Sequence, residues 1–448
     1  MAPLSRVFIA NRGEIAVRVV RACRTLGIEC VVGASEADLD GLAAQLADRA
    51  ICIGPPPAAE SYLRADTIVA AALGTGCDAL HPGYGFLSES PLLAASAAEH
   101  GLVFVGPPVE AIELAGDKLR AREAAAAAGL PVLAGGELET LAQARAFAAR
   151  TGYPLVLKAA GGGGGRGIKQ ITAAEELDGA FALAAAEAQA AFGDARLYGE
   201  RFISPARHVE VQVAAGADGA AIHLGERDCS VQRRYQKLIE ESPAPALPEG
   251  TTEALRAAAV AMAHAIGYRN LGTVEFVVDP ASGEFFFLEV NCRIQVEHPV
   301  TEAVTGLDLV AMQLRIAAGE PLPLAQEDVV LEGHAIEARL TAEDAAAGFR
   351  PSPGRLSRFE APAFDGLRVD THCSAGTTIP PYYDSLMAKL IAHARDRETA
   401  TALLIDALDA LIVEGVETNR AVLRDILAHE DFANAAVSTG WLEELVAA

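Results

Sequence analysis

The sequence is short of positive charge, of paired cysteines and of long apolar runs. Its net charge is −24, from 60 acidic and 36 basic residues, which argues against nucleic acid and an anionic membrane surface as partners. No apolar run reaches membrane-spanning length, and the N-terminus has no signal-peptide core. The seven cysteines are scattered, odd in number and form no C-x-x-C pair, so we expect a reduced, cytoplasmic protein without a zinc site.

The composition is that of a globular enzyme, with 51% hydrophobic and 21% charged residues. At 448 residues, the chain can form two or three domains with substantial cores. The acidic balance does not exclude a phosphate ligand, because a few basic residues gathered at one site can still attract it.

Residues 285–302 are the most informative stretch of the chain. Read as a strand, in which side chains alternate between two faces, this stretch has its polar residues on one face and its apolar residues on the other. The polar face carries Glu289, Asn291, Arg293, Gln295 and Glu297. Carboxylate and amide oxygens suit Mg²⁺, and an arginine suits a small oxyanion. A charge-alternating surface strand is the alternative.

The segment just upstream predicts a hairpin partner for this strand. Residues 272–278 form a second strand pattern, and residues 279–284 are rich in turn formers. The hairpin would set Glu275 opposite Glu289, and two facing acids destabilise a sheet unless a cation lies between them. We therefore predict a divalent metal held by Glu275, Glu289 and Asn291.

The first 114 residues alternate between strand and helix patterns, which predicts a parallel sheet. The first strand leads into Asn11-Arg-Gly-Glu14, so a G-x-G-x-x-G dinucleotide motif is absent there. A Gly- and Pro-rich segment, residues 81–89, follows a later strand, at the position where open α/β sheets bind ligands. An ordinary structural turn is the alternative.

A smaller lobe is predicted after a helix over residues 117–128, which carries Lys118 in its first turn. A strand at residues 153–158 ends in Lys158 and runs into the glycines of residues 161–167. Because another strand follows, a strand–flap–strand unit fits better than a Rossmann turn or a P-loop. The glycine amides could close over phosphates beside Lys158 and Arg166, although a flexible linker would have the same composition.

Two polar segments follow this lobe. Residues 207–213 alternate as a strand and include His208, for which a core position is the commoner case. Residues 226–241 gather four cations beside Gln232, which indicates either an anion-facing segment or a solvated loop.

Six motifs together identify the chain as similar to the biotin carboxylase component of biotin-dependent, acyl-CoA type carboxylases, which are ATP-grasp enzymes. The resemblance extends from Val7 to about Leu445. It is carried by Ile9-Ala-Asn-Arg-Gly-Glu-Ile15, His81-Pro-Gly-Tyr-Gly-Phe-Leu-Ser-Glu89, Lys158 with the glycine run, Glu226-Arg-Asp-Cys-Ser230, Arg293-Ile-Gln-Val-Glu-His-Pro-Val-Thr-Glu302 and Pro380-Pro-Tyr-Tyr-Asp384.

The resemblance implies an α/β and α+β protein with the ATP-grasp fold. It would have an N-terminal Rossmann-like parallel-sheet domain (residues 1–114) and an ATP-grasp domain (115–330) with a small glycine-flap lobe at about 131–203. A C-terminal α+β domain (331–448) would follow, whose sequence shows short strands and then helices over residues 398–413 and 417–429.

The reaction implied is the conversion of ATP, bicarbonate and biotin to ADP, phosphate and carboxybiotin through carboxyphosphate. Biotin would arrive on a biotin carboxyl carrier protein or domain, and a carboxyltransferase subunit would use the product. Members of this family commonly form homodimers, which we also expect here.

The resemblance also implies roles for individual residues. ATP would be held by Lys118, Lys158, the flap residues Gly164, Gly165, Arg166 and Gly167, the segment Glu200, Arg201, Phe202 and Ile203 between the lobes, and His208, Gln232 and Tyr235. Mg²⁺ or Mn²⁺ would bind Glu275, Glu289 and Asn291. Bicarbonate would bind Arg293, Gln295 and the Val296 amide beside Lys237. Glu297 would be the general base, Arg339 would stabilise the biotin enolate, and Tyr84 would contact the substrate.

Three positions depart from the family pattern, namely Tyr235 for His, Cys292 for Thr or Pro, and Thr341 for Asn. Two alternative functions remain open. Another ATP-grasp ligase would share the flap and the metal hairpin but would not need Arg293 with Glu297. A non-catalytic nucleotide-binding subunit would not need to keep these residues.

We predict that the chain itself carries no biotin. Biotin attachment in this family needs a Met-Lys pair on a hairpin, whereas here Ala388 separates Met387 from Lys389. We also expect no carrier domain after it. An avidin blot of the purified chain should be negative, and a biotin signal on it would refute the prediction.

Overall fold

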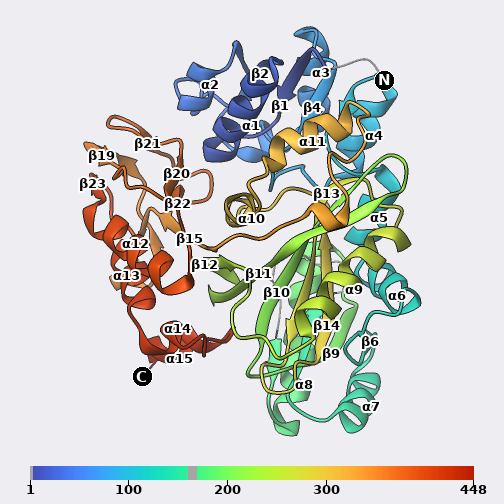
Figure 1. Ribbon diagram of the computed structural model, residues 1–448. Helices are drawn as coiled ribbons and strands as arrows, with labels where there is room; N and C mark the ends of the chain where they lie inside the picture. Colours follow the sequence, from blue (N-terminus) through green and yellow to red (C-terminus); the bar gives the residue numbers. More distant parts are fainter. Residues whose placement is uncertain (1–3, 160–168, 448) are drawn as a thin grey trace.

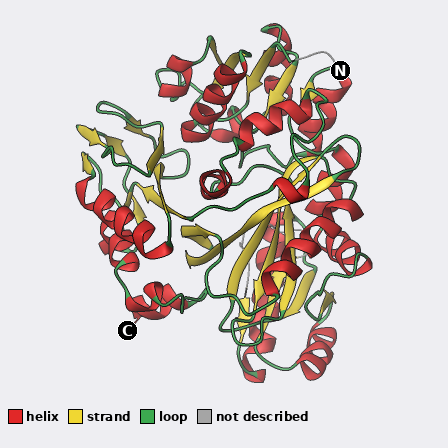
Figure 2. Cartoon of the chain, viewed as in Figure 1, coloured by secondary structure: helices red, strands yellow, loops and turns green. Residues whose placement is uncertain are grey.

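The structure, a computed structural model that describes residues 4–159 and 169–447, is built around one long antiparallel sheet. A parallel-sheet unit lies at the top of Figure 1, a small lobe lies at the bottom, and the C-terminal helices lie at the left. Figure 2 shows helices against the strands in each of these parts. The predicted combination of α/β and α+β organisation is confirmed.

The N-terminal unit holds a five-stranded parallel sheet with strand order β3-β2-β1-β4-β5, as its alternating pattern predicted. Its strands are β1 (Arg6–Ile9), β2 (Glu29–Ala34), β3 (Arg49–Cys52), β4 (Ala79–His81) and β5 (Val103–Phe104). Its helices are α1 (Gly13–Leu26), α2 (Leu42–Leu46), the 3₁₀ turn η1 (Ala58–Glu60), α3 (Ala65–Gly74), α4 (Pro91–Glu99) and α5 (Val109–Gly116).

The strand order reverses between β1 and β4, which is the point where open α/β sheets commonly bind ligands. The Asn11 side chain bridges this edge by donating to the carbonyls of Pro82 and Tyr84, both at 2.7 Å. Gly83 lies against Asn11 with a φ of +63°, and an added Cβ would come within 2.8 Å of that side chain. The segment after β4 is therefore held in one shape and presents Tyr84.

The small lobe is a four-stranded antiparallel sheet covered by helices. It follows α6 (Lys118–Ala127), whose N-cap Asp117 accepts from the Leu119 and Arg120 amides. Its elements are β6 (Gly135–Leu138), α7 (Leu141–Thr151), β7 (Leu155–Ala159), β8 (Lys169–Ile171), the 3₁₀ turn η2 (Ala174–Glu176), α8 (Leu177–Phe192) and β9 (Leu197–Arg201). Of the four residues predicted to lie between the lobes, Glu200 and Arg201 belong to strand β9, and Phe202 and Ile203 belong to the connection after it.

The long central sheet has eight strands in the order β14-β13-β10-β11-β12-β15-β22-β20. They are β10 (Arg207–Ala215), β11 (Ala221–Arg233), β12 (Gln236–Ser242), β13 (Asn270–Val278), β14 (Phe285–Asn291), β15 (His334–Thr341), β20 (Leu367–Thr371) and β22 (Leu386–Ala394). Associated helices are α9 (Thr251–Ala265), α10 (His298–Thr305), α11 (Leu309–Ala317) and the 3₁₀ turn η3 (Gln326–Asp328). The sheet continues past residue 330, so the C-terminal strands extend the central sheet.

Two sequence expectations in this region were wrong. Strand β14 ends at Asn291, residues 292–297 form a loop, and α10 begins at His298, where a continuous strand was predicted. Pro299 lies in the first turn of α10, where its missing amide costs nothing, and this favours a helix start over further strand pairing. The alternative of a solvated loop for residues 226–241 was also wrong, because this segment forms most of the β11–β12 hairpin.

The remaining C-terminal elements are short strand pairs and helices. The strands are β16 (Glu343–Asp344), β17 (Arg350–Pro351), β18 (Gly354–Arg355), β19 (Arg358–Glu360), β21 (Thr378–Ile379) and β23 (Ile412–Glu414). The helices are the 3₁₀ turn η4 (Ala345–Ala347), α12 (Arg397–Ala410), α13 (Arg420–Leu427), α14 (Glu430–Ala433) and α15 (Trp441–Ala447). The first two α-helices match the two predicted from sequence within a few residues.

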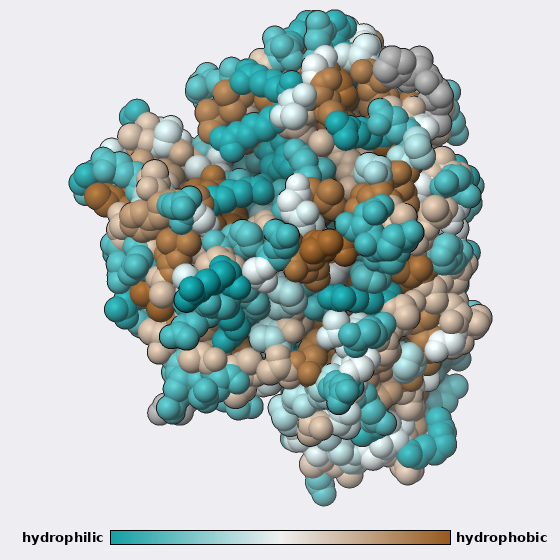
Figure 3. Space-filling model, in the orientation of Figure 1, coloured by the Kyte–Doolittle hydropathy of each residue, from teal (hydrophilic) through white to brown (hydrophobic). Residues whose placement is uncertain are grey.

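Apolar side chains from all parts form the core, including the fully buried Phe8, Phe276 and Phe287. On the face shown in Figure 3, apolar residues form scattered patches between hydrophilic ones. Among the described residues, no helix combines the length and apolarity needed to cross a bilayer.

Candidate active site

A cavity of about 610 Å³ lies where the units meet. It is lined by every predicted site residue that the structure describes, namely Tyr84, Lys118, Lys158, Glu200, Arg201, Phe202, Ile203, His208, Gln232, Tyr235, Lys237, Glu275, Glu289, Asn291, Arg293, Gln295, Val296, Glu297 and Arg339. The flap residues Gly164, Gly165, Arg166 and Gly167 lie outside the described residues. Residues far apart in the sequence therefore meet at one site.

Three glutamates form a row across neighbouring strands at one side of this cavity. Glu210 on β10 pairs with Glu275 on β13, which in turn pairs with Glu289 on β14. The predicted facing of Glu275 and Glu289 is confirmed. Glu210 was missed, although the alternation of residues 207–213 puts it on the same face as His208. Like charges at adjacent positions repel, so this row needs compensating cations.

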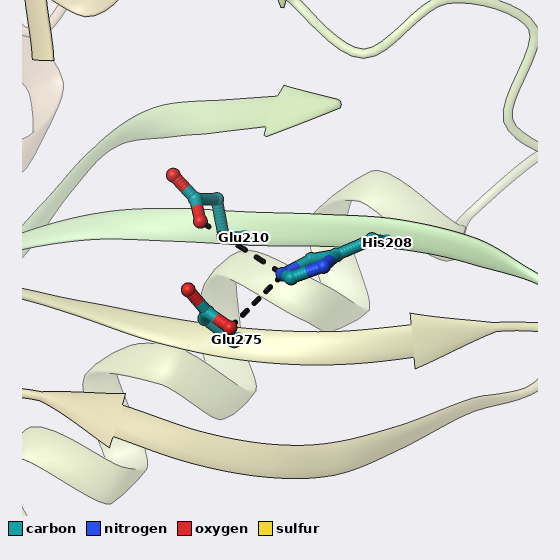
Figure 4. A group of neighbouring side chains, drawn as sticks. All are labelled: His208, Glu210 and Glu275. Carbon is teal, nitrogen blue, oxygen red and sulfur yellow. Dashed lines mark ion pairs between the residues drawn. The ribbon is translucent and has the colours of Figure 1, made fainter. Parts of the chain in front are cut away.

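Lys237 supplies much of this compensating charge. Its Nζ donates to Glu210 at 2.6 Å, to Glu275 at 3.1 Å and to Glu297 at 2.5 Å. Burial opposes the ammonium charge, but the surrounding negative groups outweigh burial and raise the pKa of Lys237 well above its ordinary value. His208 adds a contact, since its Nε2 lies 3.0 Å from Glu275 and 4.0 Å from Glu210 (Figure 4).

A fully buried arginine, Arg227, holds Glu210 from the neighbouring strand. It donates to Glu210 at 2.6 Å, to Gln212 at 2.8 Å, to Thr273 at 3.1 Å and to Thr301 of α10 at 2.9 Å. The sequence suggested that the cations of residues 226–241 face a bound anion. For Arg227, the anion is a carboxylate of the protein itself, which only the strand pairing reveals.

Glu297 lies between two cations at the start of α10. It is 1% exposed and accepts from Lys237 and from Arg339, whose Nη2 is 2.8 Å away. Burial would raise the pKa of Glu297, but Lys237, Arg339 and Arg227 hold it well below its usual range. Arg339 also lies 2.5 Å from Glu240, a fully buried acid whose pKa burial raises to about 7.

The loop of residues 292–297, called the anion loop below, is organised by Arg293. This side chain donates to Gln295 at 2.6 Å and to Asn291 at 2.8 Å, and its Nε donates to Glu89 at 2.9 Å. Glu89 ends the Gly- and Pro-rich segment after β4 and was missed as a site residue. Within the part of the chain that the structure describes, the amides of Gln295 and Val296 donate no hydrogen bond, so they remain available to an anion.

The opposite end of the cavity combines cations with apolar walls. Lys158 donates to Glu200 at 2.6 Å, and Arg122 pairs with the other oxygen of Glu200. Burial lowers the pKa of Lys118, which faces the same space. The apolar walls are Leu133, Val156, Ile203 and Leu288. This end suits a flat apolar ring joined to a phosphate chain. Arg122 was missed, because nothing in its helix distinguishes it from a surface arginine.

The predicted metal ligands Glu275 and Glu289 face each other on β13 and β14, and Asn291 lies two residues further along β14. Burial and the neighbouring Glu275 raise the pKa of Glu289, which means that a positive charge beside it would be stabilising. Two carboxylates and an amide are oxygen donors of the kind that Mg²⁺ and Mn²⁺ prefer, so the residues present fit such an ion.

The three positions that depart from the family pattern differ in their exposure to the cavity. Cys292 is buried in the core beside Ala111 and does not line the cavity. Tyr235, which is 54% exposed at the turn between β11 and β12, and Thr341, at the end of β15, both line it.

Three families of known proteins match successive parts of the chain. Residues 3–112 match "Biotin carboxylase, N-terminal domain", residues 117–325 match "Carbamoyl-phosphate synthase L chain, ATP binding domain", and residues 337–444 match "Biotin carboxylase C-terminal domain". The biotin carboxylase of Pseudomonas aeruginosa is 48% identical over 444 residues, which cover 98% of both chains. The chain belongs to the biotin carboxylase family.

Solved structures of biotin carboxylases share the fold of this family member over almost its whole length. A Campylobacter jejuni biotin carboxylase in complex with β,γ-ATP has a TM-score of 0.95 and 44% identity, covering 98% of this chain and 99% of that one. The biotin carboxylase domain dimer of Hydrogenobacter thermophilus 2-oxoglutarate carboxylase, with MgADP, ADP and bicarbonate, also has a TM-score of 0.95 and 44% identity, covering 99% and 98%. The predicted ATP-grasp fold is confirmed.

Replacing Lys237, which contacts three buried glutamates, should destabilise the fold. Lys237→Met would leave Glu210, Glu275 and Glu297 buried without their shared cation, which typically costs about 3–5 kcal/mol. Equilibrium denaturant unfolding measures this loss. The control is Lys169→Met, which removes a partly exposed pair with Glu187 and should cost less than about 1 kcal/mol. If Lys237→Met and the wild-type protein were equally stable, Lys237 would not be the cation that compensates the three buried glutamates.

Proposed function

We propose that this chain catalyses the ATP-dependent carboxylation of biotin with bicarbonate, the first half-reaction of an acyl-CoA type carboxylase. A bicarbonate oxygen attacks the γ-phosphorus of ATP, the bond to the leaving ADP breaks, and carboxyphosphate forms. Carboxyphosphate splits into CO₂ and phosphate. The phosphate takes the ureido proton of biotin, and the nitrogen attacks CO₂ to give carboxybiotin.

One observation carries this proposal. The row of facing acids that suits a metal–phosphate unit lies beside the anion loop, and the two are joined by the hydrogen bond from Gln295 to Glu275 at 3.1 Å. A small oxyanion bound by Arg293 and the Gln295 and Val296 amides would therefore lie next to a bound nucleotide phosphate. Another carboxylate ligase of this fold would not require Arg293 and Glu297 in this arrangement.

ATP would lie along the cavity, with its adenine ring between the apolar walls and its phosphates beside the row formed by Glu210, Glu275 and Glu289. Glu200 to Ile203 would contact the adenine, and Lys118, Lys158 and His208 would meet the phosphates, helped by Gln232 and the predicted flap. Tyr235 would line the nucleotide site in place of the family histidine. Positive charge at this end compensates the phosphate charge in a strongly acidic protein.

Glu275, Glu289 and Asn291 would hold Mg²⁺ or Mn²⁺. A divalent ion bound there supplies positive charge to the phosphate oxygens of ATP. The chain's own residues prepare this position, because Lys237 and His208 already neutralise part of the charge on Glu275.

Glu297 would remove the bicarbonate proton. With Lys237 and Arg339 in contact, Glu297 is ionised but only weakly basic. Anionic substrates would draw these two cations toward themselves, and the weaker contact with Glu297 would raise the basicity of that carboxylate when bicarbonate is present.

Arg339 would stabilise the oxyanion that biotin carries after it loses its ureido proton. Its guanidinium keeps its charge at any relevant pH, because Glu240 and Glu297 outweigh the effect of burial and raise its pKa. Tyr84 would contact the same substrate from the N-terminal unit.

The wider organisation is part of the proposal. Biotin would come from a separate carrier protein or domain, and a carboxyltransferase subunit would receive the product. The Hydrogenobacter relative is a dimer, which supports a homodimer here, and sedimentation at micromolar concentration would test it. Seven free thiols support a cytoplasmic location, and the three family matches support domain boundaries near residues 114 and 330.

An ATP hydrolysis assay tests the function. Hydrolysis should depend on bicarbonate, and free biotin should stimulate it further while carboxybiotin accumulates. A rate of ATP hydrolysis that does not depend on bicarbonate would contradict the proposal. An absence of hydrolysis under all conditions would favour a non-catalytic nucleotide-binding subunit.

In the same assay, Glu297→Gln should slow bicarbonate-dependent hydrolysis by about 10²–10⁴-fold, the usual loss for a general base. ATP affinity should change little, because Glu297 has no part in the nucleotide end. Near-normal turnover of the Glu297→Gln variant would show that Glu297 is not the general base.

Arg339→Gln separates the two halves of the reaction. Carboxybiotin formation should fall much more than biotin-independent, bicarbonate-stimulated hydrolysis, because the biotin oxyanion appears only after phosphoryl transfer. Glu289→Gln is the contrast and should impair every ATP-dependent step. An unchanged ratio of biotin-dependent to biotin-independent hydrolysis in Arg339→Gln would reassign this residue to bicarbonate.

A further inference from the structure

Each carbonyl from Ile294 to Glu297 in the anion loop accepts a hydrogen bond. Ile294 accepts from Arg293, Gln295 accepts from the His298 ring Nδ1 at 2.7 Å, and Glu297 accepts from an amide of α10. These donors lie within a few residues of their acceptors. The Val296 carbonyl is different, because it accepts at 2.7 Å from the Nζ of Lys389, which lies on β22 and is 93 residues away.

Lys389 is fully buried and unexplained by the chemistry proposed above. Its Nζ also lies 3.2 Å from Glu14, a buried residue in the first turn of α1. Burial opposes the charge of Lys389, but Glu14, Glu337 and Asp370 outweigh it and raise its pKa. An ammonium group is thus maintained away from water, which requires that its partners stay in place.

Glu14 continues this chain of contacts, since it accepts a hydrogen bond from the Tyr84 hydroxyl. The connected residues are therefore Tyr84, Glu14, Lys389 and Val296. The first and last line the cavity, whereas Glu14 and Lys389 lie behind it. One buried ion pair joins the N-terminal unit, the C-terminal strands and the anion loop.

We propose that Lys389 is a positioning residue for the bicarbonate site. Through the Val296 carbonyl it fixes the end of the anion loop, and through Glu14 it fixes the hydroxyl of Tyr84. This role rests on the proposed function, because it takes bicarbonate as the ligand of the loop. The same burial leaves the Lys389 amine inaccessible to a modifying enzyme.

The test uses two variants of the full-length protein. Lys389→Met keeps the side-chain length but removes the donor to Val296, and it leaves the Glu14 carboxylate buried without its lysine. Glu14→Gln/Lys389→Met removes the donor and the unpaired charge together. The second variant therefore separates positioning of the loop from the stability of a buried ion pair.

Both variants should raise the bicarbonate KM by about tenfold or more while the ATP KM stays within about twofold, because a small displacement of binding groups weakens a small ligand strongly. Tm should fall in Lys389→Met and recover at least partly in the double variant. If Lys389→Met does not fold, the bicarbonate KM of the double variant alone tests the proposal.

A wild-type bicarbonate KM in the double variant would overturn the proposal, and so would an equal rise in the KM of ATP. The wild-type protein, assayed in parallel, distinguishes this failure from that of the proposed function. Bicarbonate-stimulated hydrolysis by wild type establishes the ligand, so normal KM values in the variants would then count against Lys389 only.

Discussion

The site depends on the compensation of charge in a place that water barely reaches. Glu210, Glu275 and Glu297 are buried, and a single ammonium, that of Lys237, contacts all three. Arg227 and Arg339 provide further positive charge at the two ends of this cluster. Buried charges are tolerated only when each has a well-placed partner, so the positions of these strands are strongly constrained. Phosphate, bicarbonate and a divalent ion would enter by exchanging with ion pairs that already exist.

The continuous sheet explains how distant residues reach this cluster. Strand β13 brings Glu275, β12 brings Lys237, and β15 brings Arg339 in the same layer. The anion loop then leaves β14 and turns back over the sheet into α10, which places Glu297 between Lys237 and Arg339. Because the sheet continues into β22, the same architecture supplies Lys389 beneath the loop. The buried acid cluster, the anion loop and Lys389 are therefore supported by one continuous sheet.

The sequence predicted what local patterns control. Alternation and turn chemistry were sufficient for the β13–β14 hairpin, and with it for the pairing of Glu275 with Glu289. The same alternation continued through residues 292–297 and was misread as strand, because periodicity does not reveal where a pairing partner ends. Glu89 and Glu210 were missed since their importance comes from partners on other elements, Arg293 and Arg227. Lys389 was considered only as a modification site, and its burial became visible only in the fold.

The account is tested most directly by following an oxygen atom from bicarbonate. Bicarbonate labelled with ¹⁸O would be supplied with ATP and biotin, and the inorganic phosphate would be analysed by mass spectrometry before the label exchanges with water. If a bicarbonate oxygen attacks the γ-phosphorus, carboxyphosphate keeps that oxygen when it splits, and each phosphate should carry one ¹⁸O. Phosphate without ¹⁸O, whose fourth oxygen comes from solvent, would show that water attacks ATP and would contradict a bicarbonate site beside the row of glutamates.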